Sequence, residues 1–392
     1  MIRTLALAAL LLAAPAQAAD TLTLRIGWLE AQVARPPMLS NLDPAPEDLG
    51  LAGARLGRAD DASAGRFLGQ AFELSETVVP PGGDALAAAR AALADASLLV
   101  VSAPAATLLA IADLPEAKGA LIFNAAAPDD ALRGEGCRAN VLHAIPSLAM
   151  RADALMQFLA ARRWTDLAMI EGTHPQDRAW AEAMARAAGK FRLKLRGRET
   201  WDHASADIRR LAGQEAPLFT QGLPDHDVLL VADELGDFAR WMMFNTWIPR
   251  PMAGSEGLVP SAWTPQAEQW GASQLQSRFR KLAGRDMRPE DYAAWAALRA
   301  LGEAATRARS AEPAALRAYL LSPAFELAGF KGRPLSFRPW NGQLRQPIPL
   351  AHPRGLVASA PLDGFLHAVN EMDTLGQDAP ESACRAFMGD KG

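Results

Sequence analysis

Along most of the chain, the apolar and polar positions form two patterns, one typical of strands and one typical of helices. The segment Leu22–Trp28 alternates apolar and polar residues, which is typical of a strand. Asp84 is placed to cap a helix over 85–93, and Ser97–Ser102 is a continuous apolar run, typical of a strand buried on both faces. The same order recurs, and it predicts helices over 105–112, 150–163, 176–188 and 205–213 and strands over 120–123, 166–170, 191–195 and 227–231. This alternation predicts an α/β fold in which mainly parallel sheets are flanked by helices.

The N-terminus has the pattern of a secretory signal peptide. Met1–Arg3 carries a positive charge, Leu5–Ala14 is apolar, and Ala16–Ala18 is a small-residue cleavage site, so the mature chain is expected to begin at Ala19. The apolar run of about ten residues is too short for a helix that crosses a bilayer. We therefore expect residues 1–18 to be removed and the protein to be exported and not embedded in a membrane. A short N-terminal membrane anchor is the alternative.

The length of the chain predicts two lobes. A mature chain of roughly 370 residues exceeds what one hydrophobic core usually serves. Beyond Trp263 the pattern becomes mainly helical, over 266–282 and 291–308, and short strands rich in proline and glycine follow over 327–358. No low-complexity linker interrupts the chain, so we expect closely spaced crossovers between the lobes.

Composition narrows the range of partners. Half of the residues are hydrophobic and the net charge is −4 with mixed signs, so neither a nucleic acid nor an acidic membrane surface is an expected partner. Two cysteines in an exported chain, Cys137 and Cys384, predict one disulfide, and two buried thiols are the alternative. The six histidines are scattered without metal-ligand spacing, so we expect no metal site.

Four segments together resemble the leucine-binding class of type I periplasmic solute-binding proteins, namely 137–147 with 166–172, 251–258 and 292–298. The resemblance implies a two-lobed fold, with lobe 1 formed by 19–144 plus about 263–338 and lobe 2 by 145–262 plus about 339–392. It also implies a monomeric, non-catalytic protein of the periplasm that binds a small molecule and docks on the permease subunits of an ABC importer. A ligand sensor for a membrane kinase would share this fold and is the alternative.

Four further segments, 35–37, 40–44, 48–54 and 65–70, are similar to the branch of this class that is associated with PQQ-dependent alcohol dehydrogenase systems. This narrower likeness implies a ligand linked to alcohol oxidation. The predicted ligand is a small planar anion, PQQ or a related molecule, with no cofactor acting as a catalyst. An amino acid and a small acid derived from an alcohol are the alternatives.

In amino-acid binders of this class, hydroxyl-bearing turns after two strands of the first lobe hold the ligand carboxylate. The corresponding positions here are Ser102 in one turn and Asn124 and Ala126 in the other, so most of the hydroxyls are absent. An α-carboxylate would therefore lack charge-assisted hydrogen bonds, which disfavours an ordinary amino acid as the ligand without excluding it. Glu256 matches the acidic residue that such binders direct at the ligand ammonium, and a surface acid is the alternative.

The second-lobe cleft loop corresponds to residues 172–177. Thr173 and His174 lie in this loop and are candidate donors to a ligand, and capping of the following helix by Thr173 is the alternative.

Tryptophan and arginine residues suggest how a planar anion would be held. The chain has ten Trp and only two Tyr, and Trp247 and Trp263 flank the Glu256 turn. An indole face suits a conjugated ring, so both are candidate contacts, Trp263 foremost. Arg35, in the loop after the first strand, is the candidate partner for a ligand carboxylate.

One enzyme reading competes with these binding functions. Residues 253–257 come within one residue of the G-x-S-x-G nucleophile elbow of serine hydrolases, which needs a strand before the serine and a helix after it. Pro249 and Pro251 disfavour that strand, and Gly257 and Pro260 disfavour that helix. The sequence therefore predicts a protein that is not an enzyme.

Overall fold

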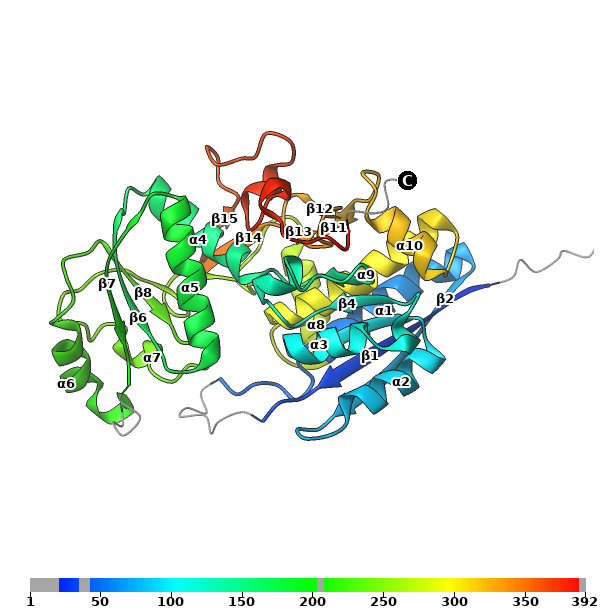
Figure 1. The fold of residues 1–392 in the computed structure, drawn as a ribbon, viewed down its shortest axis with the longest axis horizontal. Helices are drawn as coiled ribbons and strands as arrows, with labels where there is room; N and C mark the ends of the chain where they lie inside the picture. The colour runs from blue at the N-terminus through cyan, green and yellow to red at the C-terminus, as the bar shows by residue number, and fades with distance from the viewer. Residues whose placement is uncertain (1–20, 35–42, 203–207, 388–392) are drawn as a thin grey trace, which may run out of the picture.

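The computed structural model describes residues 21–34, 43–202 and 208–387, and it forms two lobes (Figure 1). The predicted signal peptide and Arg35 lie outside the described residues. Each lobe is a parallel β-sheet with helices on both faces, which confirms the predicted fold class.

The sheet of lobe 1 has the order β2-β1-β3-β4-β5, and every pair in it is parallel. Its strands are β1 (Leu22–Ala31), β2 (Gln70–Val79), β3 (Leu98–Ser102), β4 (Leu121–Asn124) and β5 (Val141–His143). Both faces of the central strands are covered, so β3 is a run of buried apolar residues. The register of β1 against β3 places Glu30 beside Ser102 at the carboxyl end of the sheet.

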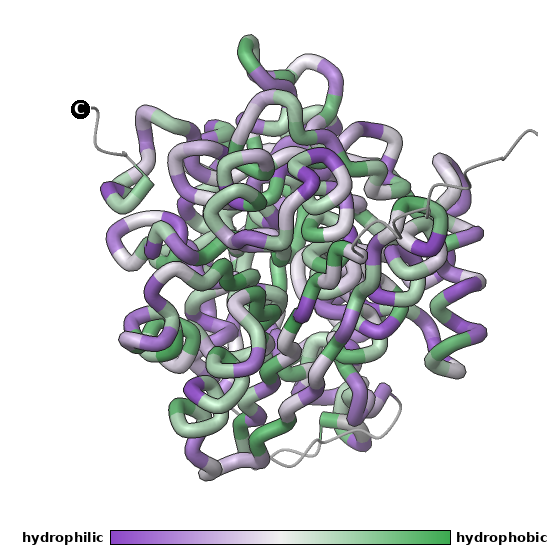
Figure 2. Tube along the Cα trace, turned by 90° about the vertical axis from the view of Figure 1, so that its right-hand side faces the viewer, coloured by the Kyte–Doolittle hydropathy of each residue, from purple (hydrophilic) through white to green (hydrophobic). Residues whose placement is uncertain are grey.

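Two layers of helices cover this sheet. One face packs on α1 (Leu51–Leu68), α8 (Ala272–Ala283), α9 (Pro289–Ala308) and α10 (Pro313–Leu320), and the other packs on α2 (Ala85–Asp95) and α3 (Ala105–Ala112). Helices α1 and α9 approach unusually closely, because a Cβ atom on Gly53 would lie 1.9 Å from the Asp291 carbonyl oxygen. The Gly50 amide also donates to the Asp291 carboxylate, at 2.8 Å. Along the outer helices, polar and apolar segments alternate, as expected of helices with one face on a core (Figure 2).

Lobe 2 contains a four-stranded parallel sheet of order β7-β6-β8-β9. Its strands are β6 (Asp166–Glu171), β7 (Lys194–Thr200), β8 (Val228–Ala232) and β9 (Met252–Gly254). Helices α4 (Leu148–Ala161) and α5 (Pro175–Lys190) cover one face, and α6 (Ile208–Thr220) and α7 (Ala239–Met242) cover the other.

Three crossovers join the lobes. The first runs from β5 to α4, the second from β10 (Val259–Pro260) to α8, and the third from β13 (Leu344–Arg345) to β14 (Ile348–His352). The third crossover follows a small sheet of β11 (Leu327–Ala328), β12 (Pro334–Phe337) and β13, and leads into a sheet of β10, β14 and β15 (Gly355–Ala360). Leu344 packs in the core of lobe 1 and Ile348 in that of lobe 2. The sequence boundaries proposed for the lobes stay predictions.

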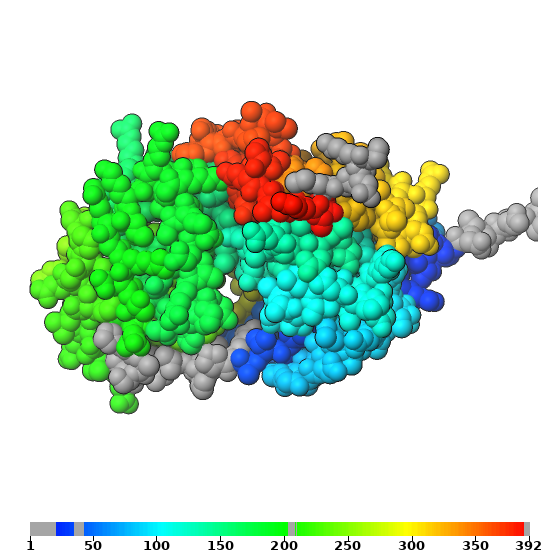
Figure 3. All heavy atoms as spheres, viewed as in Figure 1, coloured from blue at the N-terminus to red at the C-terminus, as the bar shows by residue number. Residues whose placement is uncertain are grey.

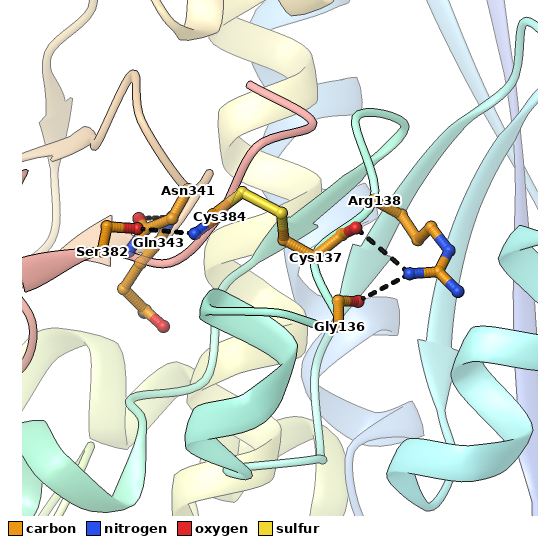
Figure 4. Close-up of a disulfide and its surroundings, with 7 residues drawn as sticks. All are labelled: Gly136, Cys137, Arg138, Asn341, Gln343, Ser382 and Cys384. Atoms are coloured by element: carbon orange, nitrogen blue, oxygen red, sulfur yellow. Dashed lines mark hydrogen bonds between the residues drawn. A yellow bond between two sulfur atoms is a disulfide. The ribbon is translucent and has the colours of Figure 1, made fainter. Parts of the chain in front are cut away.

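The C-terminal segment, residues 361–387, runs from lobe 2 back to lobe 1. Leu375 packs in the core of lobe 2, whereas Cys384 forms an S–S bond of 2.03 Å with Cys137 of lobe 1, the pair that the cysteine count singled out (Figure 4). Beside the bridge, Arg138 donates to the carbonyl oxygens of Gly136 and Cys137, and the Cys384 amide donates to the Ser382 hydroxyl. The segment therefore contacts both lobes.

Candidate ligand-binding site

The carboxyl ends of the parallel strands mark the candidate site. In open α/β sheets, ligands bind outside these ends. Here β1, β3 and β4 end on one side and β6, β8 and β9 on the other, and a hollow lies between the two lobes (Figure 3). We call this hollow the interlobe cleft.

On the side of lobe 1, Asn124 shapes a turn instead of offering its amide to a ligand. Its Oδ1 accepts hydrogen bonds from the Ala126 and Ala127 amides, at 3.2 and 2.9 Å. Its Nδ2 donates to the Ala127 carbonyl at 2.8 Å and lies 3.1 Å from the His143 Nδ1 atom. Asn124 is fully buried and holds the turn that contains Ala126. A direct contact of Asn124 or Ala126 with a ligand stays a prediction.

Ser102 is different. It lies at the end of β3, half-buried, and its hydroxyl has no hydrogen-bond partner within 21–34, 43–202 and 208–387. It is therefore available to a ligand.

On the side of lobe 2, a network of charged side chains joins three strand ends. Arg151 in α4 donates to both carboxylate oxygens of Glu234, at 2.9 and 3.3 Å, and to the Pro260 carbonyl at 3.2 Å. The Ser255 hydroxyl donates to Glu234 at 2.9 Å and accepts from the Asp233 amide at 2.9 Å. Burial would raise the pKa of Glu234, but Arg151 and Ser255 outweigh it and leave the pKa below its usual value.

Two buried aspartates hold the loops beneath this network. Asp177 accepts from the Glu234 and His174 amides, and Asp233 accepts from three successive amides at the start of α7. Burial raises the pKa of Asp177 to about 6. The His174 Nε2 atom lies 2.8 Å from an Asp237 oxygen, so this imidazole already has a protein partner. His174, not Thr173, is the N-cap of α5, and Thr173 is exposed without a described hydrogen-bond partner.

Two carboxylates near the cleft have no ion-pair partner among the described residues. Glu256, half-buried in the turn after β9, makes no hydrogen bond or ion pair with any residue that the structure describes. Glu290, in the first turn of α9, makes no ion pair within the same residues, and burial raises its pKa against the attraction of Arg151 and Arg288. Arg151 itself is committed to Glu234. The described part of the cleft is therefore electronegative.

The two candidate tryptophans, Trp263 and Trp247, lie in different surroundings. Trp263 is 3% exposed, its ring stacks on Tyr292 with centroids 4.9 Å apart, and its Nε1 donates to Gln276 at 2.9 Å. A cavity of only about 10 Å³ borders it, which is room for one water. Ligand stacking on Trp263 stays a prediction, and it requires local opening. Trp247 follows α7 on the way to the amino end of β9, where its amide donates to Thr220, so the structure does not bring it to the strand carboxyl ends.

Sequence reasoning missed Arg151, Glu234 and Glu290. Arg151 and Glu290 lie in helices, where a single charged residue gives no sign of its partner. Glu234 follows a strand that was predicted, at a position where parallel sheets place functional side chains, and this was the signal available. Ser255 is the serine of the elbow-like motif, and its hydroxyl donates a hydrogen bond to Glu234. The residues after it lead into β10 and not into a helix.

Comparison with known proteins identifies the fold. No family model matches the sequence, and no curated protein matches it. Among solved structures, a branched-chain amino acid ABC transporter periplasmic ligand-binding protein from Burkholderia xenovorans LB400 is 16% identical, with 93% of this chain and 100% of that chain covered and a TM-score of 0.71. The chain has the two-lobed fold of type I periplasmic binding proteins.

Two further structures carry ligands. An ABC transporter substrate-binding protein from Desulfitobacterium hafniense in complex with Leu is 16% identical, with 86% of this chain and 99% of that chain covered and a TM-score of 0.60. A branched-chain amino acid transporter substrate-binding protein from Streptococcus pneumoniae in complex with isoleucine is 14% identical, with coverages of 86% and 98% and a TM-score of 0.62. At these identities the likeness shows the fold alone.

Two searches of the described residues gave no candidates. None of the helices placed in the structure is long and apolar enough to span a membrane. Outside the four undescribed stretches, no group of three or more histidine, cysteine, aspartate and glutamate residues is arranged to hold a metal ion.

Proposed function

We propose that this protein is a periplasmic solute-binding protein that captures a small ligand bearing an ammonium group, of the amino acid type, and delivers it to the permease of an ABC importer. The fold and the signal-peptide pattern support the general function. The observation that carries the ligand class is the electronegative cleft, where Glu256 lacks a counter-ion while Arg151 is already paired.

Capture follows from the two-lobed construction. The ligand binds between strand ends that belong to different lobes, so a closed arrangement allows contacts with both lobes and is stabilised by the ligand. Glu256 neutralises the ligand ammonium from lobe 2, and Ser102 donates its hydroxyl to an acceptor from lobe 1. The network of Glu234 and Ser255 keeps the Glu256 turn in place.

PQQ remains the competing ligand. It carries several carboxylates, and binding it next to Glu256 and Glu290 would oppose like charges. Its predicted partners are Arg35, outside the described residues, and the buried ring of Trp263. An amine ligand requires neither, and the solved relatives that hold Leu and isoleucine support it.

The test is native mass spectrometry of the freshly purified protein, followed by calorimetric titration with the amino acids and with PQQ. An amino acid should bind, and Glu256→Gln should weaken it roughly ten- to hundredfold, the loss of one charge-assisted hydrogen bond. Glu326→Gln, an exposed residue without a described partner, is the matched control and should leave the affinity unchanged. If PQQ binds and Glu256→Gln leaves its affinity intact, the amino acid assignment fails.

A further inference from the structure

A second hollow lies where the two lobes meet the C-terminal segment. It has a volume of about 540 Å³, within the range of small-molecule sites. Its walls come from the loop after β4 in lobe 1, from α4 and α5 in lobe 2, and from residues 376–383. None of the strand-end residues of the interlobe cleft lines it. We call it the junction cavity.

The charges that line the junction cavity do not balance. Four carboxylates, those of Asp130, Glu135, Asp153 and Glu381, face two cations, Arg186 and Lys190. Both cations are already paired: Arg186 donates to Asp130 at 2.9 Å, and Lys190 donates to Asp153 at 2.7 Å. Lys190 also donates to the carbonyl oxygens of Thr374 and Gly376. Two carboxylates therefore remain without a cation.

These remaining groups are acceptors. Glu135 is exposed and makes no ion pair or hydrogen bond with any residue in the described ranges. Among the described residues, Glu381 accepts one hydrogen bond, from the Asp378 amide at 3.1 Å. Gln377 also lines the cavity, and its buried Oε1 atom has no hydrogen-bond partner in the part of the chain that the structure describes. A ligand that donates hydrogen bonds and carries positive charge would pair with both carboxylates.

The apolar part of the wall indicates the form of that ligand. Ala149, Ala183 and Ala187 line the cavity from α4 and α5 and present methyl groups between the charged positions. Methyl groups favour contact with methylene groups, and carboxylates favour ammonium groups. A bare metal ion would be poorly held, since the described residues contain no metal-ligand cluster.

We infer that the junction cavity is a second binding site, separate from the interlobe cleft, for a small aliphatic diamine. Its ammonium groups contact Glu135 and Glu381, and its methylene chain lies on the alanines. Because both lobes and the C-terminal segment form the walls, a bound diamine ties the lobes together beside the Asp130–Arg186 ion pair, which itself joins lobe 1 to lobe 2.

The experiment is calorimetric titration of the full mature protein with 1,4-diaminobutane and 1,5-diaminopentane. Butane-1,4-diol has a similar chain without charge, and succinate has a similar chain with the opposite charge. We expect the diamines to bind, the diol and succinate not to bind, and affinity to fall as salt rises because the carboxylates are partly exposed. The double variant Glu135→Gln/Glu381→Gln should weaken diamine binding at least tenfold, and Glu326→Gln should not change it.

Three results would overturn the inference: no diamine binding, equal binding of the diol, or undiminished affinity in the double variant. A loss of diamine binding in Glu256→Gln would place the amine in the interlobe cleft and would likewise overturn it. The double variant lies outside the cleft, so its outcome does not depend on which ligand the cleft binds.

Discussion

Replacing Arg151 with methionine removes the cation that holds the lobe 2 side of the cleft together. The Arg151 and Glu234 side chains are 17% and 21% exposed, and their two hydrogen bonds form a bidentate pair. The guanidinium also lies 4.5 Å from the centre of the Trp180 ring. Breaking a fully buried pair costs about 3–5 kcal/mol and breaking an exposed pair costs under about 1 kcal/mol, so partial exposure places the expected loss at about 2–4 kcal/mol.

The assay is urea unfolding at neutral pH. Most of the loss arises because Glu234 stays charged and partly buried without a cation, so Glu234→Gln added to Arg151→Met should restore part of the stability. The free energy of unfolding of Arg151→Lys should stay below that of the wild type, because a lysine cannot form the bidentate pair with Glu234 and reach the Pro260 carbonyl at the same time. A cost below about 1 kcal/mol for Arg151→Met, or a double variant no more stable than the single one, would refute this reasoning.

Two further predictions test the packing and the electrostatics. Gly53→Ala should destabilise the protein by about 1–3 kcal/mol in urea unfolding, because the new Cβ would meet the Asp291 carbonyl oxygen of α9. Gly189→Ala in α5 is the control and should be neutral or stabilising, since nothing lies near its Cβ. Equal effects of the two substitutions would contradict the close α1–α9 contact. Burial raises the pKa of Asp153 to about 6, although Lys190 lowers it, so between about pH 4 and 6 the folded state holds a proton that the unfolded state has released. The free energy of unfolding should therefore fall by about 2 kcal/mol from about pH 4 to 7 relative to that of Asp153→Asn. A difference between the two proteins that does not change with pH would contradict this prediction.

The periodic elements were predictable where local pattern and burial agree. Strands β1, β3, β6 and β8 match their predicted segments closely, because buried parallel strands leave a recognisable apolar run. Helix α1 was not predicted as a helix. Its glycines at 53 and 57 lower helix propensity, and only the tertiary contact with α9 explains why they are needed there.

Other elements began later than the pattern suggested. β7 begins at Lys194, not Phe191, since the chain leaves α5 through Arg192 with a positive φ of 58°. Helix α8 begins at Ala272 instead of Gln266 because Trp270 and Gly271 both have positive φ and form a turn before it. Such turns depend on tertiary contacts that a hydropathy pattern does not record.

The site was harder to predict than the fold, for a related reason. Proximity in sequence suggested that Trp247 and Trp263 belong with Glu256. In the structure the Trp247 amide donates to Thr220, at the end of α6, and the Trp263 ring stacks on Tyr292. The Arg151–Glu234 pair joins residues 83 positions apart, and no local rule pairs them. The sequence pointed to loops at the ends of parallel strands, but which side chains in these loops remain available depends on hydrogen bonds that only the fold defines.

Those hydrogen bonds also determine which side chains of the cleft are free to contact a ligand. In the described part of the cleft, Asn124, His174, Glu234 and Ser255 are occupied by protein partners, whereas Ser102, Thr173 and Glu256 are not. Two hydroxyls can donate to an acceptor, and one carboxylate requires a cation. Burying Glu256 under a closed lobe without that cation would leave an unpaired charge, which costs far more than the surface position does. If the proposed function is right, closure of the lobes is favoured by a ligand that brings both a positive charge and a hydrogen-bond acceptor, more than by a purely apolar solute or a simple polyanion.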